Sequence, residues 1–389
     1  MLKLKALRSK DRKMRILVLT YNYGDTASGV VTYRVVSELK RQGNEVFVIT
    51  SETSIKDNYV IECPNRLSDN SVIIRGAKKL YRLLTGDLLE YNFLWRKRAY
   101  KRSLEVIEQY KIDWIYCRTT PLDSCVVGSK LKKKTNLKLL LHFTDPVPSE
   151  YSTHSKWLLN ILIKKYGKIA EQSDLVSYGT KEMQKCQESL FHISDGKSFV
   201  SPDAASSSEP LCLPNEKGDL KKLVYFGGFG DYRDPYPLFE AIEAMNKVGT
   251  KVILLVYMRK PLTQKAIPSN VTFMGRTDDM KSALAEADIL VDLDVINEKS
   301  VYLSSKIKDY ILVNRPILAI TRAESPTFNL VKGMNSFICC ENEKDKIIES
   351  INAIMHKDQL DFVYEERQLL IDYFSPYRVA KEILEKMRQ

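Results

Sequence analysis

The sequence predicts an α/β protein built from two doubly wound, Rossmann-like parallel-sheet domains that face a cleft. Its 389 residues exceed the roughly 250 to 300 residues at which a single hydrophobic core stops growing. In both halves, continuous apolar strand segments alternate with helical segments, as in parallel sheets. Between the halves lies a stretch rich in Pro and Ser, SPDAASSSEP, which is typical of a linker. We therefore predict domains at 1–205 and 206–375, with a C-terminal helix at 376–389 that packs on the N-terminal domain.

The N-terminal half opens with a βαβ unit: a strand at 15–20, a turn rich in small residues at 24–29, a helix at 30–41 and a strand at 45–50. In the helix, Val31, Val35, Val36 and Leu39 recur every three to four positions, so one face is apolar. Further elements are predicted as strands at 114–117, 137–142 and 174–178 and a helix at 157–170.

The C-terminal half repeats this alternation. Its strands are predicted at 223–226, 251–257, 271–274, 288–293, 316–320 and 336–340, and its helices at 237–246, 278–287, 304–313 and 344–355. Ligands of such sheets bind where the carboxyl ends of the strands meet the cleft.

Composition narrows the class of protein. Hydrophobic residues make up 44% and charged residues 28% of the chain, which is ordinary for a globular protein. No apolar run reaches the roughly 18 residues of a membrane-spanning helix, and the N-terminal run is too short for a signal peptide. Seven cysteines form no CxxC pair, so neither a disulfide framework nor a metal is predicted. We expect a cytoplasmic protein.

Charge is unevenly distributed. Residues 1–170 hold 32 Lys and Arg against 16 Asp and Glu, a net charge of +16, whereas residues 171–389 hold 28 against 33, a net charge of −5. Segments 75–84, 95–102 and 156–169 interleave basic with apolar and aromatic residues. This pattern predicts contact with an anionic membrane surface, with a solvated helix face as the alternative. Nucleic-acid binding is disfavoured, because no basic and aromatic repeat of a known module is present.

The segment SSKIKDYILVNRPILAI carries the strongest candidate site. Ser304 and Ser305 are predicted to cap a helix whose amides hold a diphosphate, and Lys306 adds a positive charge. Asp309 lies about one turn further on, where its carboxylate can take two hydroxyls of a ribose. The alternative is an ordinary capped helix with solvated charges.

Two glycine turns are further candidates. In YFGGFGDYR, Gly227 and Gly228 follow a strand and admit a phosphate to the backbone, with Arg233 as a counter-charge; a simple tight turn is the alternative. In GDTASGVV, Val residues stand where a P-loop needs Lys and Ser or Thr, so an ATPase is disfavoured. Gly29 at the helix start either admits a phosphate or allows tight packing.

Acidic residues and a histidine also end predicted strands. His142 and Asp145 in LHFTDP lie on the predicted cleft rim and are candidate catalytic residues, with an Asp-Pro turn as the alternative. Asp292 and Asp294 in DLD suggest a metal-bound nucleotide, but such short acidic matches arise often by chance, and we discount them.

Together these segments resemble the retaining family 4 glycosyltransferases, which have the B-type (GT-B) fold. The opening MRILVLTYNYG…SGVVTYRVVSELKRQGNEVFVIT is similar to that of the family, and SSKIKDYILVNRPILAI is similar to its PSK-x-x-EY-x-x-x-x-x-P phrase. The resemblance covers about three quarters of the chain. It implies a nucleotide-sugar donor in the C-terminal domain, an acceptor in the N-terminal domain, no metal, and retention at the anomeric carbon.

The resemblance also assigns residues. It implies that Asp309 binds the ribose, that Ser305 and Lys306 bind the diphosphate, and that Gly228 belongs to the phosphate loop. An Asp-Pro phrase in part of the family implies that His142 and Asp145 lie near the transferred sugar.

The chain departs from the pattern of the family in two places. The first Glu of the Glu-x7-Glu motif is replaced by Val301, for which Asp294 or Glu298 can substitute only in a rebuilt loop. The Arg and Lys that follow the glycine turn are replaced in FGDYRDP, where Arg233 lies within one residue of the Lys position.

We therefore expect a hexosyltransferase-like enzyme that moves a sugar from a UDP- or GDP-sugar to a saccharide or polyprenyl-diphosphate-linked acceptor in surface polysaccharide biosynthesis. It would work at the inner face of the plasma membrane, without a cofactor or nucleic acid. The alternatives are a sugar-nucleotide epimerase and a non-catalytic protein that binds a nucleotide or a partner, the latter motivated by Val301.

Overall fold

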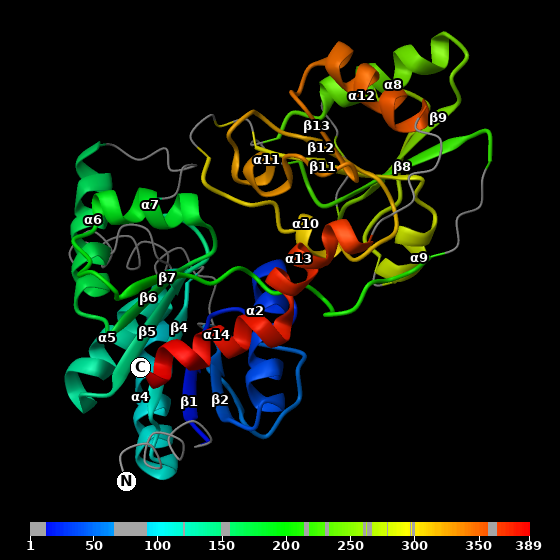
Figure 1. Cartoon of the computed structure of the whole chain (residues 1–389). Coiled ribbons are helices and arrows are strands. Elements are labelled where there is room, and N and C mark those ends of the chain that lie inside the picture. The colour runs from blue at the N-terminus through cyan, green and yellow to red at the C-terminus, as the bar shows by residue number, and fades with distance from the viewer. Residues whose placement is uncertain are drawn as a thin grey trace, which may run out of the picture. The chain divides into compact units, whose positions relative to one another are not determined.

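The computed structural model describes residues 13–65, 92–119, 121–148, 156–213, 218–229, 233–259, 262, 267–277, 279–295, 297, 300–356 and 364–389. The chain divides into two compact units (Figure 1). The N-terminal unit comprises Met1–Ala204 and Pro376–Gln389, and the C-terminal unit comprises Ala205–Ser375. The predicted boundary, after residue 205, lies one residue further along the chain.

The N-terminal unit contains a seven-stranded parallel sheet of order β3-β2-β1-β4-β5-β6-β7. Its strands are β1 (Arg15–Leu19), β2 (Glu45–Thr50), β3 (Val60–Glu62), β4 (Trp114–Arg118), β5 (Lys138–Phe143), β6 (Leu175–Tyr178) and β7 (Ser198–Val200). The chain winds outward from β1 to β3, then returns to β4 on the other side of β1. The strand order therefore reverses between β1 and β4, which makes the sheet doubly wound.

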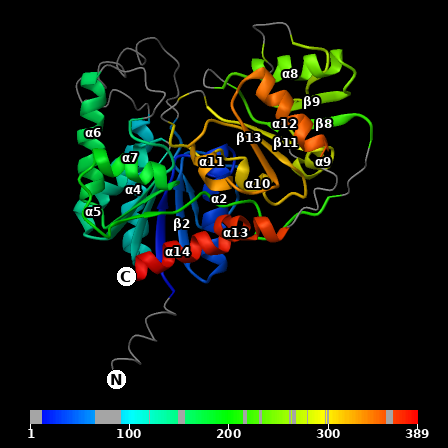
Figure 2. The same cartoon turned by 45° about the horizontal axis from the view of Figure 1, so that its top comes forward.

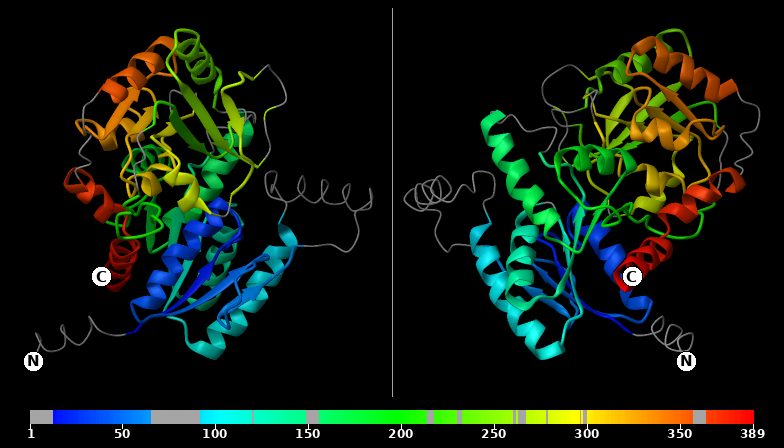
Figure 3. Two further views of the ribbon diagram at one scale, coloured as in Figure 1. Left: turned by 90° about the vertical axis from the view of Figure 1, so that its right-hand side faces the viewer. Right: turned by 60° about the vertical axis from the view of Figure 1, so that its left-hand side comes forward.

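Helices cover both faces of this sheet. They are α2 (Ala27–Arg41), α4 (Phe93–Tyr110), α5 (Asp123–Thr135), α6 (Lys156–Glu171), α7 (Lys181–Leu190) and α14 (Pro376–Arg388). Helices α4 and α5 lie together against the central strands (Figure 3). On the opposite face, α14 lies along α2 (Figure 2). Buried α14 residues such as Ile383 share a core with Val35 of α2 and Ile16 of β1.

The C-terminal unit contains a six-stranded parallel sheet of order β10-β9-β8-β11-β12-β13. Its strands are β8 (Lys221–Phe226), β9 (Val252–Tyr257), β10 (Val271–Phe273), β11 (Ile289–Leu293), β12 (Ile317–Ile320) and β13 (Phe337–Cys340). Here the order reverses between β8 and β11. One face packs on α8 (Tyr236–Lys247) and α12 (Lys344–His356). The other packs on α9 (Met280–Ala285), α10 (Ile307–Tyr310), α11 (Pro326–Val331) and α13 (Tyr364–Phe374).

The predicted fold class, two Rossmann-like parallel-sheet domains, is confirmed. One element is corrected: the helix predicted at 304–313 is only the four-residue α10, Ile307–Tyr310. Its continuation is interrupted because Val313 forms a parallel bridge with Leu211, whose N–H donates to the carbonyl of Leu312 at 2.6 Å. A contact distant in sequence thus replaces the last helical turn.

Candidate functional site

In the C-terminal unit, the candidate site lies at the point where the strand order reverses. Gly227 and Gly228 directly follow β8, and Asp292 and Asp294 lie at the end of the neighbouring β11. Lys306 reaches the same place from the segment before α10. A strand-order reversal in an open parallel sheet leaves a crevice at the carboxyl ends of the strands, which is where ligands bind.

Gly227 is required by both its backbone and its surroundings. Its φ is +108°, in the region that side chains disfavour. A Cβ built at this position would lie 3.1 Å from Cε of Lys306. The glycine therefore lets the lysine side chain cross directly over the turn after β8. Gly228 is exposed, and a Cβ there would meet nothing within 4 Å.

Lys306 is enclosed by an acidic and an aromatic side chain. Only 13% of its side chain is exposed, and its Nζ lies 3.6 Å from Oδ1 of Asp292. The same atom lies 4.9 Å from the centre of the Tyr225 ring, a cation–π distance. Burial lowers the pKa of the ammonium, which the charge of Asp292 opposes. The structure thus holds a nearly buried cation at the end of the sheet.

Ser304 does not cap α10 as predicted. Its hydroxyl donates to Oδ1 of Asp292 at 2.5 Å, and α10 has no side-chain cap. Ser304 instead donates to the carboxylate of Asp292, because this side chain is only 1% exposed and needs hydrogen-bond donors. The other oxygen of Asp292, Oδ2, is buried and has no hydrogen-bond partner among the described residues.

Asp294 and Arg233 complete the charged cluster. Asp294 accepts hydrogen bonds from the hydroxyl of Thr321 at 2.7 Å and from its neighbour Val295 N–H at 2.8 Å. Its pKa is raised by burial and by the charge of Asp292. Nε of Arg233 donates to the carbonyl of Leu293 at 2.8 Å, so the guanidinium is attached to the end of β11.

Of the residues predicted to bind the donor, the structure brings Gly227, Ser304 and Lys306 together with Arg233. Ser305 is exposed. Asp309 lies on α10, and its Oδ1 accepts a hydrogen bond from the backbone N–H of Ser206 at 2.8 Å. Part of this carboxylate therefore holds the chain segment at the start of the C-terminal unit.

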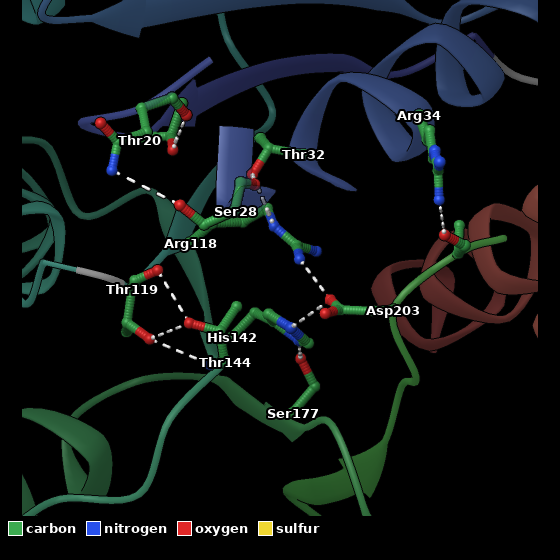
Figure 4. A network of polar contacts seen from close by, with 12 residues as sticks. Thr20, Ser28, Thr32, Arg34, Arg118, Thr119, His142, Thr144, Ser177 and Asp203 are labelled. Carbon is green, nitrogen blue, oxygen red and sulfur yellow. Dashed lines mark hydrogen bonds and ion pairs between the residues drawn. The ribbon is translucent and has the colours of Figure 1, made fainter. Parts of the chain in front are cut away.

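The N-terminal unit has its own polar network, also at the carboxyl ends of the strands (Figure 4). Arg118 ends β4 and is 1% exposed. Its Nε donates to Thr32 at 3.1 Å, its Nη1 to the hydroxyl of Tyr116 at 3.0 Å, and its Nη2 to Asp203 at 2.9 Å. The guanidinium thereby joins helix α2, strand β4 and the segment that follows β7.

His142, the last but one residue of β5, lies beside this guanidinium. The ring is fully buried, so it is not exposed on a rim as predicted. Its Nδ1 is hydrogen-bonded to the Ser177 hydroxyl at 3.0 Å, and its Nε2 lies 4.0 Å from Oδ1 of Asp203. Burial, followed by the charge of Arg118, holds the pKa of His142 well below its ordinary value. Both causes favour the neutral imidazole.

Gly29 and Asp145 are placed differently from this network. A Cβ at Gly29 would lie 2.9 Å from the backbone nitrogen of Gly24 and 3.0 Å from that of Tyr23. Tight packing alone therefore requires this glycine, while the Thr26 hydroxyl accepts from its N–H at 3.1 Å. Asp145 is half-buried in the turn after β5.

Two features singled out in the sequence, Glu298 and the basic segment 75–84, lie outside the described residues. Within the described part of the chain, no three His, Cys, Asp or Glu side chains are close enough together to hold a metal ion. None of the helices in the described ranges is long and apolar enough to cross a bilayer.

Sequence reasoning missed Arg118 and Asp203 and discounted Asp292. One signal was available: Arg118 and Asp292 are charged residues at the ends of apolar strand segments, WIYCR and ILVDL. A charge in that position is costly to bury without a partner. The partners themselves come from distant segments, which no local pattern reveals.

No protein-family model and no curated protein matches the chain. Solved structures do. A glycosyltransferase from Rickettsia africae has a TM-score of 0.68 at 15% identity, covering 97% of this chain and 98% of its own. The lipopolysaccharide outer core galactosyltransferase WaaB has a TM-score of 0.61 at 13% identity, covering 96% and 99%. A structure from Listeria monocytogenes assigned as a UDP-N-acetylglucosamine 2-epimerase has a TM-score of 0.51 at 10% identity, covering 96% and 95%. The chain therefore has the GT-B fold.

Proposed function

We propose that this protein is a glycosyltransferase that uses a UDP- or GDP-sugar donor. The observation that carries the proposal is the meeting of Gly227, Arg233 and Lys306 where the strand order of the C-terminal unit reverses. Two cations beside a glycine turn are suited to a diphosphate. The GT-B fold of the similar structures supports the assignment to sugar transfer.

In the proposed reaction, the bond between the anomeric carbon and the diphosphate breaks, and the acceptor hydroxyl oxygen forms a bond to that carbon from the same face. The diphosphate leaves with an additional negative charge and takes up the proton of the acceptor hydroxyl. Lys306 and Arg233 are the groups that stabilise this charge. Both are held in place before the donor arrives, so little reorganisation is needed. In the absence of donor, the ammonium of Lys306 is paired with Asp292. When the donor binds, this ammonium would pair with the diphosphate instead. We propose that no metal is required and that the configuration at the anomeric carbon is retained.

Asp309 is the proposed ribose ligand, although one of its oxygens also holds Ser206. Alanine at this position would remove both roles at once. Asp309→Asn separates them, because the amide oxygen still accepts from Ser206 N–H while the charge that favours two ribose hydroxyls is lost.

The acceptor, a saccharide or a lipid-linked saccharide, is assigned to the N-terminal unit. His142 is buried, and its surroundings favour the neutral imidazole. We therefore expect it to act as a positioning residue through Asp203. Asp145, half-buried in the next turn, is the group that can contact a sugar hydroxyl. The net charge of +16 in residues 1–170 supports work at an anionic membrane surface, where surface polysaccharides are assembled.

The test is a calorimetric titration without added metal against UDP, GDP, ADP and CMP. We expect one nucleoside diphosphate to bind selectively and Lys306→Gln to weaken it roughly 10- to 150-fold, because a hydrogen bond to a charged group contributes about 1.5 to 3 kcal/mol. Lys251→Gln removes an exposed lysine of the same unit and should change nothing. Equal effects of the two variants, or no binding, would remove the basis of the proposal.

An epimerase is the second candidate, favoured by the similarity to the Listeria monocytogenes structure. It would convert the nucleotide sugar without an acceptor and release no free nucleotide. A non-catalytic role, suggested by Val301, would leave nucleotide binding intact with no donor consumed. Product analysis of donor incubated with and without saccharide acceptor separates the three.

A further inference from the structure

Helices α4 and α5 of the N-terminal unit enclose a groove of about 700 Å³. The two helices pack side by side (Figures 1 and 3). Residues of both helices line the groove, and no residue of the candidate donor site does.

The rim of the groove is cationic. Lys97 of α4 and Lys130, Lys133 and Lys134 of α5 line it, and all four are exposed. None of them forms an ion pair with another residue of the described structure. Lys133 and Lys134 lie in the last turn of α5, where a positive charge stabilises the helix dipole. That explanation does not cover Lys97 or Lys130.

The acidic side chain paired with a lining residue of the groove, Asp123, is already neutralised. Arg96, which also lines the groove, places its Nε 3.0 Å from Asp123, and Asn92 donates to the other oxygen of that carboxylate at 2.8 Å. No Asp or Glu is among the described residues that line the groove. Four ammonium groups around one depression repel each other, and an anion bound between them would relieve this repulsion.

The floor of the groove is apolar and aromatic. Val126 and Val127 are buried there, and Phe93 and Tyr100 are half-buried beside them. A free phosphate needs no such floor. A phosphate attached to a hydrocarbon chain uses both parts, because lysines meet the anionic head group while apolar and aromatic side chains meet the acyl region.

We propose that this groove binds an anionic phospholipid, with the phosphodiester between Lys97 and the α5 lysines and the start of an acyl chain over Tyr100 and Val126. This deepens the membrane association proposed above and rests on it. It assigns that association to one site rather than to the net charge of the unit.

The experiment measures binding of the full chain to phosphatidylcholine vesicles with and without phosphatidylglycerol. Three double variants each replace two exposed lysines four residues apart with glutamine: Lys130 and Lys134 on α5, Lys164 and Lys168 on α6, and Lys181 and Lys185 on α7. Each variant loses the same charge from the same unit. Only the first lies in the groove.

We expect binding to vesicles that contain phosphatidylglycerol and a loss of about 30-fold in the α5 variant, since each lysine near an anionic surface contributes roughly fivefold. The α6 and α7 variants should lose much less. Tyr100→Ser, which leaves the charge unchanged, should also weaken vesicle binding. Nucleotide binding should be unchanged in all of them.

Equal losses in the three double variants would show that net charge alone attracts the protein and would overturn the site. A larger loss in the α6 variant would assign binding to that helix instead and would also overturn it. Displacement of the vesicles by soluble glycerol phosphate at equal phosphate concentration would identify a free-phosphate site and overturn the lipid assignment. Failure to bind any vesicle would overturn this proposal and the membrane association together, while the nucleotide titration tests sugar transfer independently.

Discussion

Replacing Gly227 with alanine tests whether the turn after β8 is built to place Lys306. The new Cβ would meet a backbone φ of +108° and would lie 3.1 Å from Cε of Lys306. Gly228→Ala is the matched control, because the same methyl group one residue later meets nothing within 4 Å and φ there is not positive.

Two effects follow from this geometry. The backbone conformation costs a non-glycine residue roughly 1 to 3 kcal/mol, so the C-terminal unit should lose that much stability. The clash itself is with a flexible side chain, which yields by moving the ammonium away from Asp292 and Tyr225. Misplacing one charged contact to a diphosphate should weaken nucleotide binding roughly 10- to 150-fold. Gly228→Ala should lie within about 0.5 kcal/mol of the parent in stability.

Differential scanning calorimetry measures the stability, and calorimetric titration with the nucleoside diphosphate selected above measures the affinity. The reasoning is refuted if the two alanine variants are equally stable. It is also refuted if Gly227→Ala loses stability but binds the nucleotide as tightly as the parent, because the turn would then have no role in placing Lys306.

Two further predictions concern the N-terminal unit, which contains all three tryptophans and can therefore be followed by their fluorescence during urea unfolding. The pKa of His142 in the folded protein lies below its ordinary value of 6.5, so the unfolded chain binds more protons below that pH and the free energy of unfolding falls as pH falls. Between about pH 6.5 and 5.5 the loss is about 1 kcal/mol, and His142→Gln should abolish it. An unchanged pH dependence in this variant would contradict the prediction. Ile383→Ala in α14 should lower the free energy of unfolding by about 2 to 5 kcal/mol, because the side chain is fully buried in the core of this unit. Glu385→Ala, at an exposed position of the same helix, is the control. Equal stability of the two variants would show that α14 does not contribute to this core.

The alternation of elements was readable because it depends on local pattern. Continuous apolar runs such as EVFVIT and VILLVY became β2 and β9 with bounds close to the predicted ones. Of the strands with three residues, β10 was predicted and β3 and β7 were missed, because so short a segment has too little periodicity to identify it. Helix α5 was missed because SKLKKKT is so rich in lysine that its apolar face is narrow.

The candidate site was only partly readable for a related reason. Gly227, Arg233 and Lys306 were identified as residue types suited to phosphate near strand and helix ends, and the fold brings them together. Their partner Asp292 was discounted, because its significance depends on Ser304 and Lys306, both more than ten residues away. Likewise, the role of Arg118 depends on its hydrogen bond to Asp203, 85 residues further along the chain.

By itself, the sequence determined the class of fold, the two domains and the unequal distribution of charge, since these follow from local periodicity and composition. Only the tertiary structure decided that Ser304 donates to Asp292 rather than capping a helix, that Val313 leaves its predicted helix to pair with Leu211, and that Nδ1 of the buried His142 is hydrogen-bonded to Ser177. In each case a buried polar group takes the partner that folding brings to it, because leaving that group without a hydrogen bond costs more than a local preference contributes.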